Sequence, residues 1–184
     1  MSKEHKRFLL DELLRVDANV LARCNCAIAG GAVRDVAHGF PFKDVDVAFW
    51  NMNTAEFLET WRQYFARCPY PVKIDGCTQA SAEGDDSRVQ AVLQFTLMGT
   101  PLGDVEVDWL LYNQEYTTLQ EVLDSHDHSI SQYGMWYDEE FDHHVGYFGK
   151  EAGHCYRLRP DISDERVARV KETCVKLDWS YNGS

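Results

Sequence analysis

Two hydrophobic periodicities run along this chain and predict its secondary structure. A helical period covers about residues 3–23, where apolar side chains recur on one face and predict an amphipathic helix. Alternation of apolar and polar residues covers 44–50, 89–97 and 105–111 and predicts strands with one buried face each. The chain therefore combines helices with half-buried strands.

Turn residues, caps and short apolar runs place the remaining elements. Gly39 and Pro41 end a short helix, and Asn53 caps a longer one that ends before Pro69. The other predictions, in chain order, are a strand at 26–29, helices at 32–38 and 54–67, a strand at 72–75, a polar loop at 78–87, a helix at 118–124, a mixed segment at 129–137, a strand at 155–158 and a helix at 162–177. This order predicts the α/β (α+β) class: a mixed β-sheet flanked by helices, with a short C-terminal hairpin and helix.

The charge balance limits the classes of partner. With 30 Asp+Glu against 18 Lys+Arg, the 184-residue chain has a formal net charge of −12. Broad nucleic-acid binding relies on many Lys and Arg side chains that neutralise phosphates, so we expect no such platform. The negative charge does not exclude a small polyphosphate ligand that is held through metal ions.

Cysteine usage and hydropathy indicate a cytoplasmic protein. The six cysteines are expected to be reduced thiols, because the N-terminus does not resemble a signal peptide, and no apolar run approaches a membrane span. A zinc site and a surface hairpin with incidental imidazoles are the alternatives for His143, His144, His154 and Cys155. Their spacing fits no common zinc finger, which favours the hairpin.

Carboxylates gather on two of the predicted strands. Asp44 and Asp46 lie two residues apart and share a strand face, and Asp104, Glu106 and Asp108 repeat this arrangement on a later strand. A solvated sheet face is the simpler interpretation. The alternative is a site for two Mg²⁺ ions, for which Mn²⁺ can substitute, because Mg²⁺ prefers a few carboxylates together with substrate phosphates.

A glycine pair upstream favours the metal–nucleotide interpretation. Gly30-Gly31 stands where a strand passes into a helix, and Arg34 follows in the first turn. Backbone N–H groups without neighbouring Cβ atoms can approach a phosphate, and the helix N-terminus favours an anion there. A tight turn explains the glycines equally well when they are taken by themselves.

The ordered motifs resemble a known family. Residues 29–35 read A-G-G-A-V-R-D and residues 43–47 read K-D-V-D-V. This resembles the head domain of DNA-polymerase-β-type nucleotidyltransferases, closest to the branch of bacterial tRNA nucleotidyltransferases (CCA-adding enzymes) and poly(A) polymerases. Asp127-His128-Ser129-Ile130-Ser131 is similar to the segment R-R-D-F-T-I-N of that branch, so the resemblance covers about 26–137.

The resemblance implies roles for the motif residues. Asp44 and Asp46 are expected to hold the two metal ions, with Asp108 or Glu106 as the third catalytic carboxylate and Asp108 slightly favoured as a ligand. The nucleotide-binding residues implied are Gly30, Gly31, Arg34, Asp35 and Lys43. Residues 1–137 then form the nucleotidyltransferase catalytic core, and 138–184 form an extension that packs on it.

The sequence departs from the family pattern at three places. Ser125 and His126 stand where arginines precede the aspartate, and we interpret His126 and His128 as structural. Residues 163–169 are the nearest counterpart of the helix E-D-x-x-R that selects the base in the tRNA enzymes, but we interpret them as a helix start capped by Ser163. After 137 there is too little chain for the neck, body and tail of that family.

The expected function is Mg²⁺-dependent transfer of NMP from an NTP to a hydroxyl, with release of pyrophosphate. The acceptor stays open among an RNA 3′ end such as tRNA, a protein, as in toxin-type relatives, and a small molecule. A non-catalytic nucleotide-binding or interaction module on the same fold is the alternative. Arg88, Gln90 and Gln94, on a polar strand face, either contact the substrates or are simply solvated.

Overall fold

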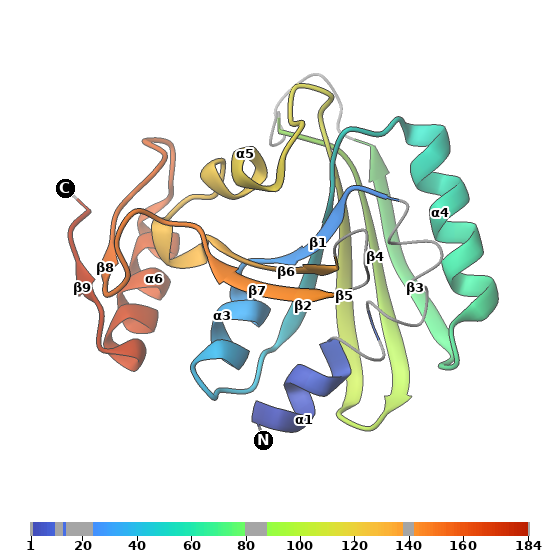
Figure 1. Cartoon of the computed structure of the whole chain (residues 1–184), viewed down its shortest axis with the longest axis horizontal. Coiled ribbons are helices and arrows are strands. Elements are labelled where there is room, and N and C mark those ends of the chain that lie inside the picture. The colour runs from blue at the N-terminus through green and yellow to red at the C-terminus, as the bar shows by residue number, and fades with distance from the viewer. Residues whose placement is uncertain (1, 10–12, 14–23, 80–87, 138–141, 184) are drawn as a thin grey trace.

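A seven-stranded mixed sheet forms the centre of the computed structural model, which describes residues 2–9, 13, 24–79, 88–137 and 142–183. The strand order is β3-β4-β5-β2-β1-β6-β7 (Figure 1). Only β2 and β5 pair in parallel, and the other neighbours are antiparallel. The predicted class, a mixed sheet flanked by helices, is confirmed.

The elements follow the predicted order closely. Their bounds are α1 Ser2–Arg7, β1 Cys26–Ala29, α3 Gly31–Ala37, β2 Asp44–Phe49, α4 Thr54–Arg67, β3 Val72–Gln79, β4 Val89–Thr100, β5 Gly103–Tyr112, α5 Leu119–Asp124, a 3₁₀ turn at Ser129–Ser131, β6 Tyr133–Tyr137, β7 His143–Tyr147, β8 His154–Cys155, α6 Asp164–Leu177 and β9 Ser180–Tyr181. Asn53 caps α4 as predicted, in a reciprocal capping box with Glu56.

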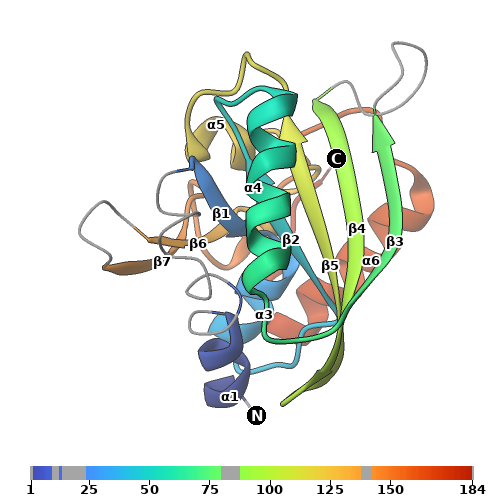
Figure 2. The same ribbon diagram turned by 90° about the vertical axis from the view of Figure 1, so that its right-hand side faces the viewer.

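The two faces of the sheet are chemically different. On one face, α4 lies over β2 and beside β5 (Figure 2), and Phe57 and Tyr64 pack against Phe95 and Trp109 in the main core. The opposite face has a small cluster under α5 near Tyr112, and it also carries the polar alternate residues of β2 and β5. The alternation of these strands therefore places every Asp and Glu of β2 and β5 on the face of the sheet that points away from α4.

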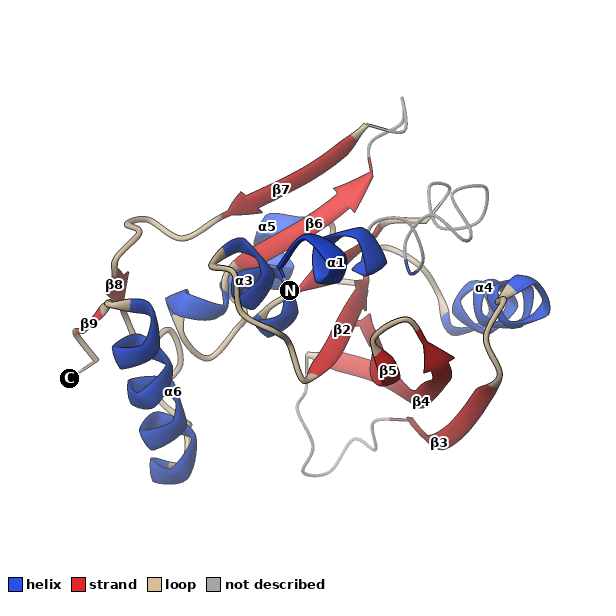
Figure 3. Ribbon diagram, turned by 90° about the horizontal axis from the view of Figure 1, so that it is seen from below, coloured by secondary structure: helices blue, strands red, loops and turns tan. Residues whose placement is uncertain are grey.

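The C-terminal segment is part of the same core. β7 pairs with β6, so a boundary after residue 137 falls within a hairpin. β8 and β9 form a small parallel pair beside α6 (Figure 3), and Cys155, Val170 and Cys174 belong to the main hydrophobic cluster. The described residues 142–183 therefore pack directly against the rest of the described chain.

Several predicted bounds differ from the observed ones. β3 runs to Gln79, although a loop was predicted from Thr78, because Cys77, Thr78 and Gln79 pair with β4. The strand predicted at 155–158 is shorter, since the backbone N–H of Tyr156 binds the Ser129 hydroxyl instead of a strand. β9 was not predicted.

The first predicted helix is described only in part. Residues 2–7 are helical as expected, and Phe8, Leu9 and Leu13 are buried. The rest of 3–23, and most of the polar loop predicted at 78–87, lie outside the described residues. No helix within the described ranges is long and apolar enough to span a bilayer.

Candidate active site

Neighbouring strands in the centre of the sheet bring the predicted carboxylates together. β2 and β5 are parallel and pair Asp46 with Asp108 and Asp44 with Glu106. Because neighbouring strands lie about 4.8 Å apart, all of these side chains share one patch of the open face. Lys43 adds a positive charge, with its Nζ 3.5 Å from Asp44 Oδ2 and 4.0 Å from Glu106 Oε2.

The glycine pair lies directly beside this patch. Ala29 is the register partner of Asp46, so Gly30 follows at the level of the carboxylate. Gly30 has φ +78°, a backbone conformation that favours glycine, and it caps α3. A Cβ at Gly30 would lie 3.8 Å from Asp46 Oδ2 and 3.5 Å from His126 Cε1.

The motif arginine has a local partner. Arg34 donates from Nε and Nη2 to Asp35 Oδ1, each at 2.9 Å, and both side chains are mostly buried. Both residues belong to α3, which begins at Gly31. The nucleotide-binding residues implied by the resemblance are therefore contiguous in space around Asp46.

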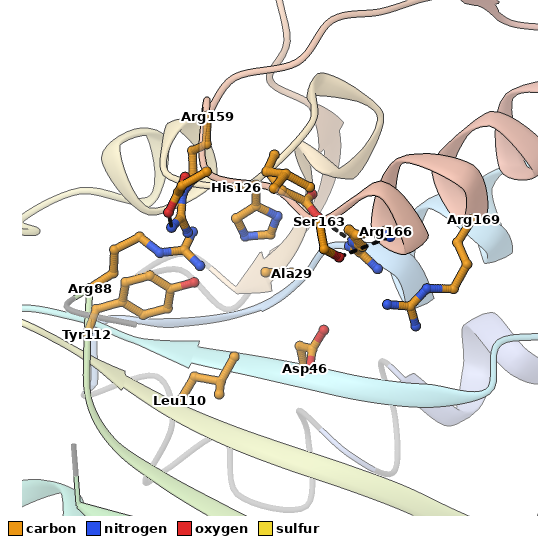
Figure 4. A pocket seen from close by; sticks show the side chains of 13 residues that line it. Ala29, Asp46, Arg88, Leu110, Tyr112, His126, Arg159, Ser163, Arg166 and Arg169 are labelled. Carbon is orange, nitrogen blue, oxygen red and sulfur yellow. Dashed lines mark hydrogen bonds and ion pairs between the residues drawn. The ribbon is translucent and has the colours of Figure 1, made fainter. Parts of the chain in front are cut away.

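Two cavities meet at Asp46. The smaller, of about 290 Å³, is lined by the predicted residues Gly31, Arg34, Asp35, Lys43 and Asp44, together with Asp46 and one side of α6. The larger, of about 480 Å³, extends under Tyr112 and His126 (Figure 4). Glu106 and Asp108 are not among the described residues that line either cavity; they lie beside it on the sheet face.

Arginines from three segments converge on the larger cavity. Arg88 precedes β4, Arg159 precedes α6, and Arg166 and Arg169 stand one helical turn apart on α6 (Figure 4). Arg88 donates to the carbonyl of Ser125, Arg159 pairs with Asp161 and Arg166 pairs with Asp127. The guanidinium of Arg169 makes no hydrogen bond or ion pair with any residue that the structure describes, and Arg169 lines both cavities.

The sequence indicated α6 only as a capped helix start. Ser163 does accept the backbone N–H of Arg166, at 3.3 Å. The structure adds that the start of α6 is also a wall of both cavities, because Arg166 and Arg169 line them together with Asp46. The sequence did contain one sign of this cavity wall: the spacing R-x-x-R directly after the helix cap. Residues three apart share a helix face, so this spacing places both arginines on the same side of α6.

His126 and His128 have different environments. His128 is fully buried, with its Nε2 3.3 Å from the Tyr181 hydroxyl, as expected of a structural residue. His126 instead lines the larger cavity. Burial lowers the pKa of His126 to about 4, and the nearby Arg88 lowers it as well, so the ring is neutral at pH 7.

Burial and mutual repulsion disfavour the charged carboxylates. Burial, with the negative charges of Asp44 and Asp108, raises the pKa of Asp46 to about 7. Burial also raises the pKa of Asp108, although a hydrogen bond from Gln94 lowers it. Gln94 Nε2 lies 3.3 and 3.2 Å from the two Asp108 oxygens. A bound divalent cation would remove this repulsion.

The donor chemistry fits Mg²⁺. Carboxylate oxygens on neighbouring strands, open to water and to a phosphate-sized cavity, are the ligands this ion prefers. Within the described residues, no three His, Cys, Asp or Glu side chains already stand in a coordinating cluster.

The alternative zinc ligands are dispersed. His143 and His144 lie on β7, and His144 stacks on Trp136. His154 and Cys155 lie on β8, where Cys155 is buried in the core. This matches the hairpin interpretation of the sequence.

Solved structures with the same architecture are enzymes of tRNA maturation. A CCA-adding enzyme in complex with CTP superposes with a TM-score of 0.62 at 18% identity, covering 98% of this chain and 42% of that one. The chain therefore shares the fold of this enzyme over the region that the two have in common. The Thermotoga maritima CCA-adding enzyme complexed with tRNA matches with a TM-score of 0.60 at 17% identity, over 96% of this chain and 39% of its own.

A third solved structure shares this fold. A tRNA nucleotidyltransferase complexed with a primer tRNA and an incoming ATP analogue gives a TM-score of 0.57 at 19% identity, over 90% of this chain and 45% of its own. This chain thus spans about two fifths of the length of the solved structures it matches. Its sequence matched no protein-family profile and no curated protein.

Proposed function

We propose that this chain is a Mg²⁺-dependent nucleotidyltransferase that moves NMP from an NTP to a hydroxyl and releases pyrophosphate. One observation carries the proposal. Asp44 and Asp46 of β2 stand in register with Glu106 and Asp108 of β5, at the meeting point of two cavities lined by arginines. Negative and positive groups that face one another across a cavity match a ligand of metal ions and phosphates.

The two cavities suggest how the nucleotide lies. The smaller one suits the triphosphate, because Gly31 offers open backbone and Arg34, Lys43 and Arg169 contribute positive charge. The larger one suits the nucleoside, since Tyr112, Leu110 and Ile162 give it apolar surface. Asp46 lines both and so stands next to the α-phosphate.

The reaction would proceed by in-line displacement. The acceptor oxygen forms a bond to the α-phosphorus, the bond from that phosphorus to the pyrophosphate oxygen breaks, and the hydroxyl proton passes to a carboxylate of the cluster. Mg²⁺ held by Asp44, Asp46 and Asp108 would supply charge neutralisation on the phosphates. Asp108 is the better third carboxylate, because it is the register partner of Asp46, whereas Glu106 is two thirds exposed.

We propose an RNA 3′ end, such as that of a tRNA, as the first acceptor to test. The support is the architecture shared with structures that contain tRNA. A protein or small-molecule hydroxyl is the outcome if RNA takes no label.

A binding experiment tests the nucleotide site. Isothermal titration with each of the four NTPs in the presence of Mn²⁺ is expected to show binding of at least one. The double variant Asp44→Asn/Asp46→Asn should abolish it, while Glu172→Gln, a carboxylate-to-amide change on the exposed side of α6, should not. Absence of binding by all four NTPs would refute the proposal.

A transfer experiment separates the catalytic from the non-catalytic interpretation. Each α-³²P-labelled NTP is incubated with the protein, Mg²⁺ and total RNA or lysate. Label on an RNA of tRNA size supports RNA as the acceptor, and label on protein supports the toxin-type activity. Nucleotide binding with no transfer to any fraction would instead support the non-catalytic module.

A further inference from the structure

A third cavity lies against the segment that carries His126 and Asp127 into the candidate active site. Its volume is about 670 Å³, which is within the range of small-molecule sites. Asp124, Ser129 and Gln132 of this segment line it, and so do residues of the connection from β7 to β8. It shares no lining residue with the two cavities at Asp46.

Hydrogen-bond acceptors are fixed on one wall. Asp124 Oδ1 accepts from Gln120 Nε2 at 2.8 Å and from Gln132 Nε2 at 2.7 Å. Both amide groups are thereby oriented, and among the described residues neither amide oxygen accepts a hydrogen bond. Gln132 is 4% exposed, so its orientation is held by packing as well. This wall therefore offers a carboxylate oxygen and amide oxygens to a ligand with several N–H donors.

A cation stands on another part of the lining. Lys150 forms no ion pair or hydrogen bond with the residues that the structure describes. The neighbouring carboxylate of Glu151 has other partners. Its Oε2 accepts a hydrogen bond from the Tyr156 hydroxyl at 3.0 Å, and its Oε1 lies 3.4 Å from His154 Nε2. The Lys150 ammonium is thus available to an anionic group of a ligand.

Apolar side chains complete the cavity. Phe148 and Tyr156 supply aromatic surface, and Leu158, which is 39% exposed, is one of the large hydrophobic residues left open to solvent. An aromatic ring would cover this surface and remove it from water.

We propose that this cavity binds a free amino acid with an aromatic side chain. The α-carboxylate pairs with Lys150, the α-ammonium donates to Asp124 and to the amide oxygens of Gln120 and Gln132, and the ring packs on Phe148, Tyr156 and Leu158. A zwitterion matches the opposite charges of the two walls, whereas a purely cationic or purely anionic ligand would satisfy only one of them.

Three probes test this assignment on the full chain by isothermal titration. L-Tryptophan carries both charges, L-tryptophanamide lacks the carboxylate and N-acetyl-L-tryptophan lacks the ammonium. L-Tryptophan is expected to bind about tenfold or more tightly than either derivative, because each derivative loses a charged hydrogen bond. Equal affinity for the three probes, or no binding of L-tryptophan, overturns the proposal.

Two variants assign the walls. Lys150→Met should weaken L-tryptophan and leave L-tryptophanamide unchanged, and Asp124→Asn should weaken L-tryptophan and leave N-acetyl-L-tryptophan unchanged. Lys6→Met, on the exposed side of α1, is the matched control and should bind all probes like the parent. If Lys150→Met binds L-tryptophan as tightly as the parent does, the assignment is wrong.

Discussion

At the scale of the residue, Gly30 has the backbone conformation that the site depends on. Its φ of +78° is strained for any residue with a Cβ, although a Cβ would have room, with its nearest neighbours at 3.5 and 3.8 Å. We therefore expect Gly30→Ala to lower the free energy of unfolding by about 1–3 kcal/mol through the backbone. Urea denaturation followed by circular dichroism measures this change.

The neighbouring glycine provides the control. Gly31 lies inside α3 and needs no left-handed backbone, and its added Cβ would lie 3.6 Å from Arg34 Nη2. Gly31→Ala should keep the stability of the parent or raise it by up to about 1 kcal/mol. If both variants lost equal stability, the special role of Gly30 in the turn would be wrong.

Arg169 allows binding to be separated from folding. Because its guanidinium makes no hydrogen bond or ion pair with the described part of the chain, Arg169→Ala should change the free energy of unfolding by less than about 0.5 kcal/mol. Loss of a charge-assisted contact to phosphate should weaken NTP binding about tenfold. Titration calorimetry beside urea denaturation checks both expectations, with Lys6→Ala as the control.

An NTP affinity of Arg169→Ala equal to that of the parent would remove α6 from the nucleotide site. A large loss of stability would show that Arg169 has a structural partner.

At the scale of the element, one ion pair joins α6 to the segment before β6. Arg166 Nε donates to Asp127 Oδ2, and Asp127 is 17% exposed. Burial would raise the pKa of Asp127, but the nearby His128, with its Nδ1 3.6 Å from Asp127 Oδ1, and the hydrogen bond and charge of Arg166 outweigh burial and hold that pKa well below its usual range. The pair therefore stabilises the fold only while Asp127 is ionised.

The stability of this contact should depend on pH in a defined direction. An unfolded aspartate titrates at about pH 3.9, and the folded pKa of Asp127 lies well below that value. The contribution is therefore complete above about pH 5, begins to fall near the unfolded pKa and is lost as the pH passes the folded pKa. Asp127→Asn should cost about 1–2 kcal/mol at pH 7, a value reduced because Arg166 is 42% exposed. Urea denaturation of parent and variant from pH 7 to pH 3 should show this difference shrinking at the acid end; a constant difference contradicts the assignment.

Local patterns predicted most of the elements and the strand faces that carry the carboxylates. Alternation in 44–50 and 105–111 predicted that Asp44 and Asp46 share a face of one strand and that Glu106 and Asp108 share a face of another, because the side-chain period of a strand is set by its backbone. The parallel register that pairs these residues is a long-range property, and so is the docking of α6. The sequence offered Arg88 only as part of a polar strand face, and Arg159 enters the same cavity from a segment far along the chain, so no local spacing could show that the two meet.

At the scale of the whole molecule, the charge of −12 is unevenly distributed. Arginines concentrate in the cavity at Asp46, while carboxylates occupy the open sheet face beside it. An anion the size of a nucleotide can therefore enter the cavity, but an extended polyanion meets Asp44, Glu106 and Asp104 on the neighbouring surface. Local positive charge serves the nucleotide, and the net charge opposes a long RNA.

This distribution predicts weak binding of unrelated RNA together with measurable binding of NTP. A fluorescein-labelled 20-nucleotide RNA should bind with Kd weaker than about 10⁻⁴ M at 150 mM KCl, because sequence-independent affinity comes from cations that neutralise successive phosphates. Fluorescence anisotropy measures it, with NTP titration of the same sample as the positive control. Tight binding whose affinity falls steeply with salt would contradict this prediction, because it would reveal a basic RNA-binding surface that the described residues lack. This chain would then be able to bind a large RNA acceptor by itself.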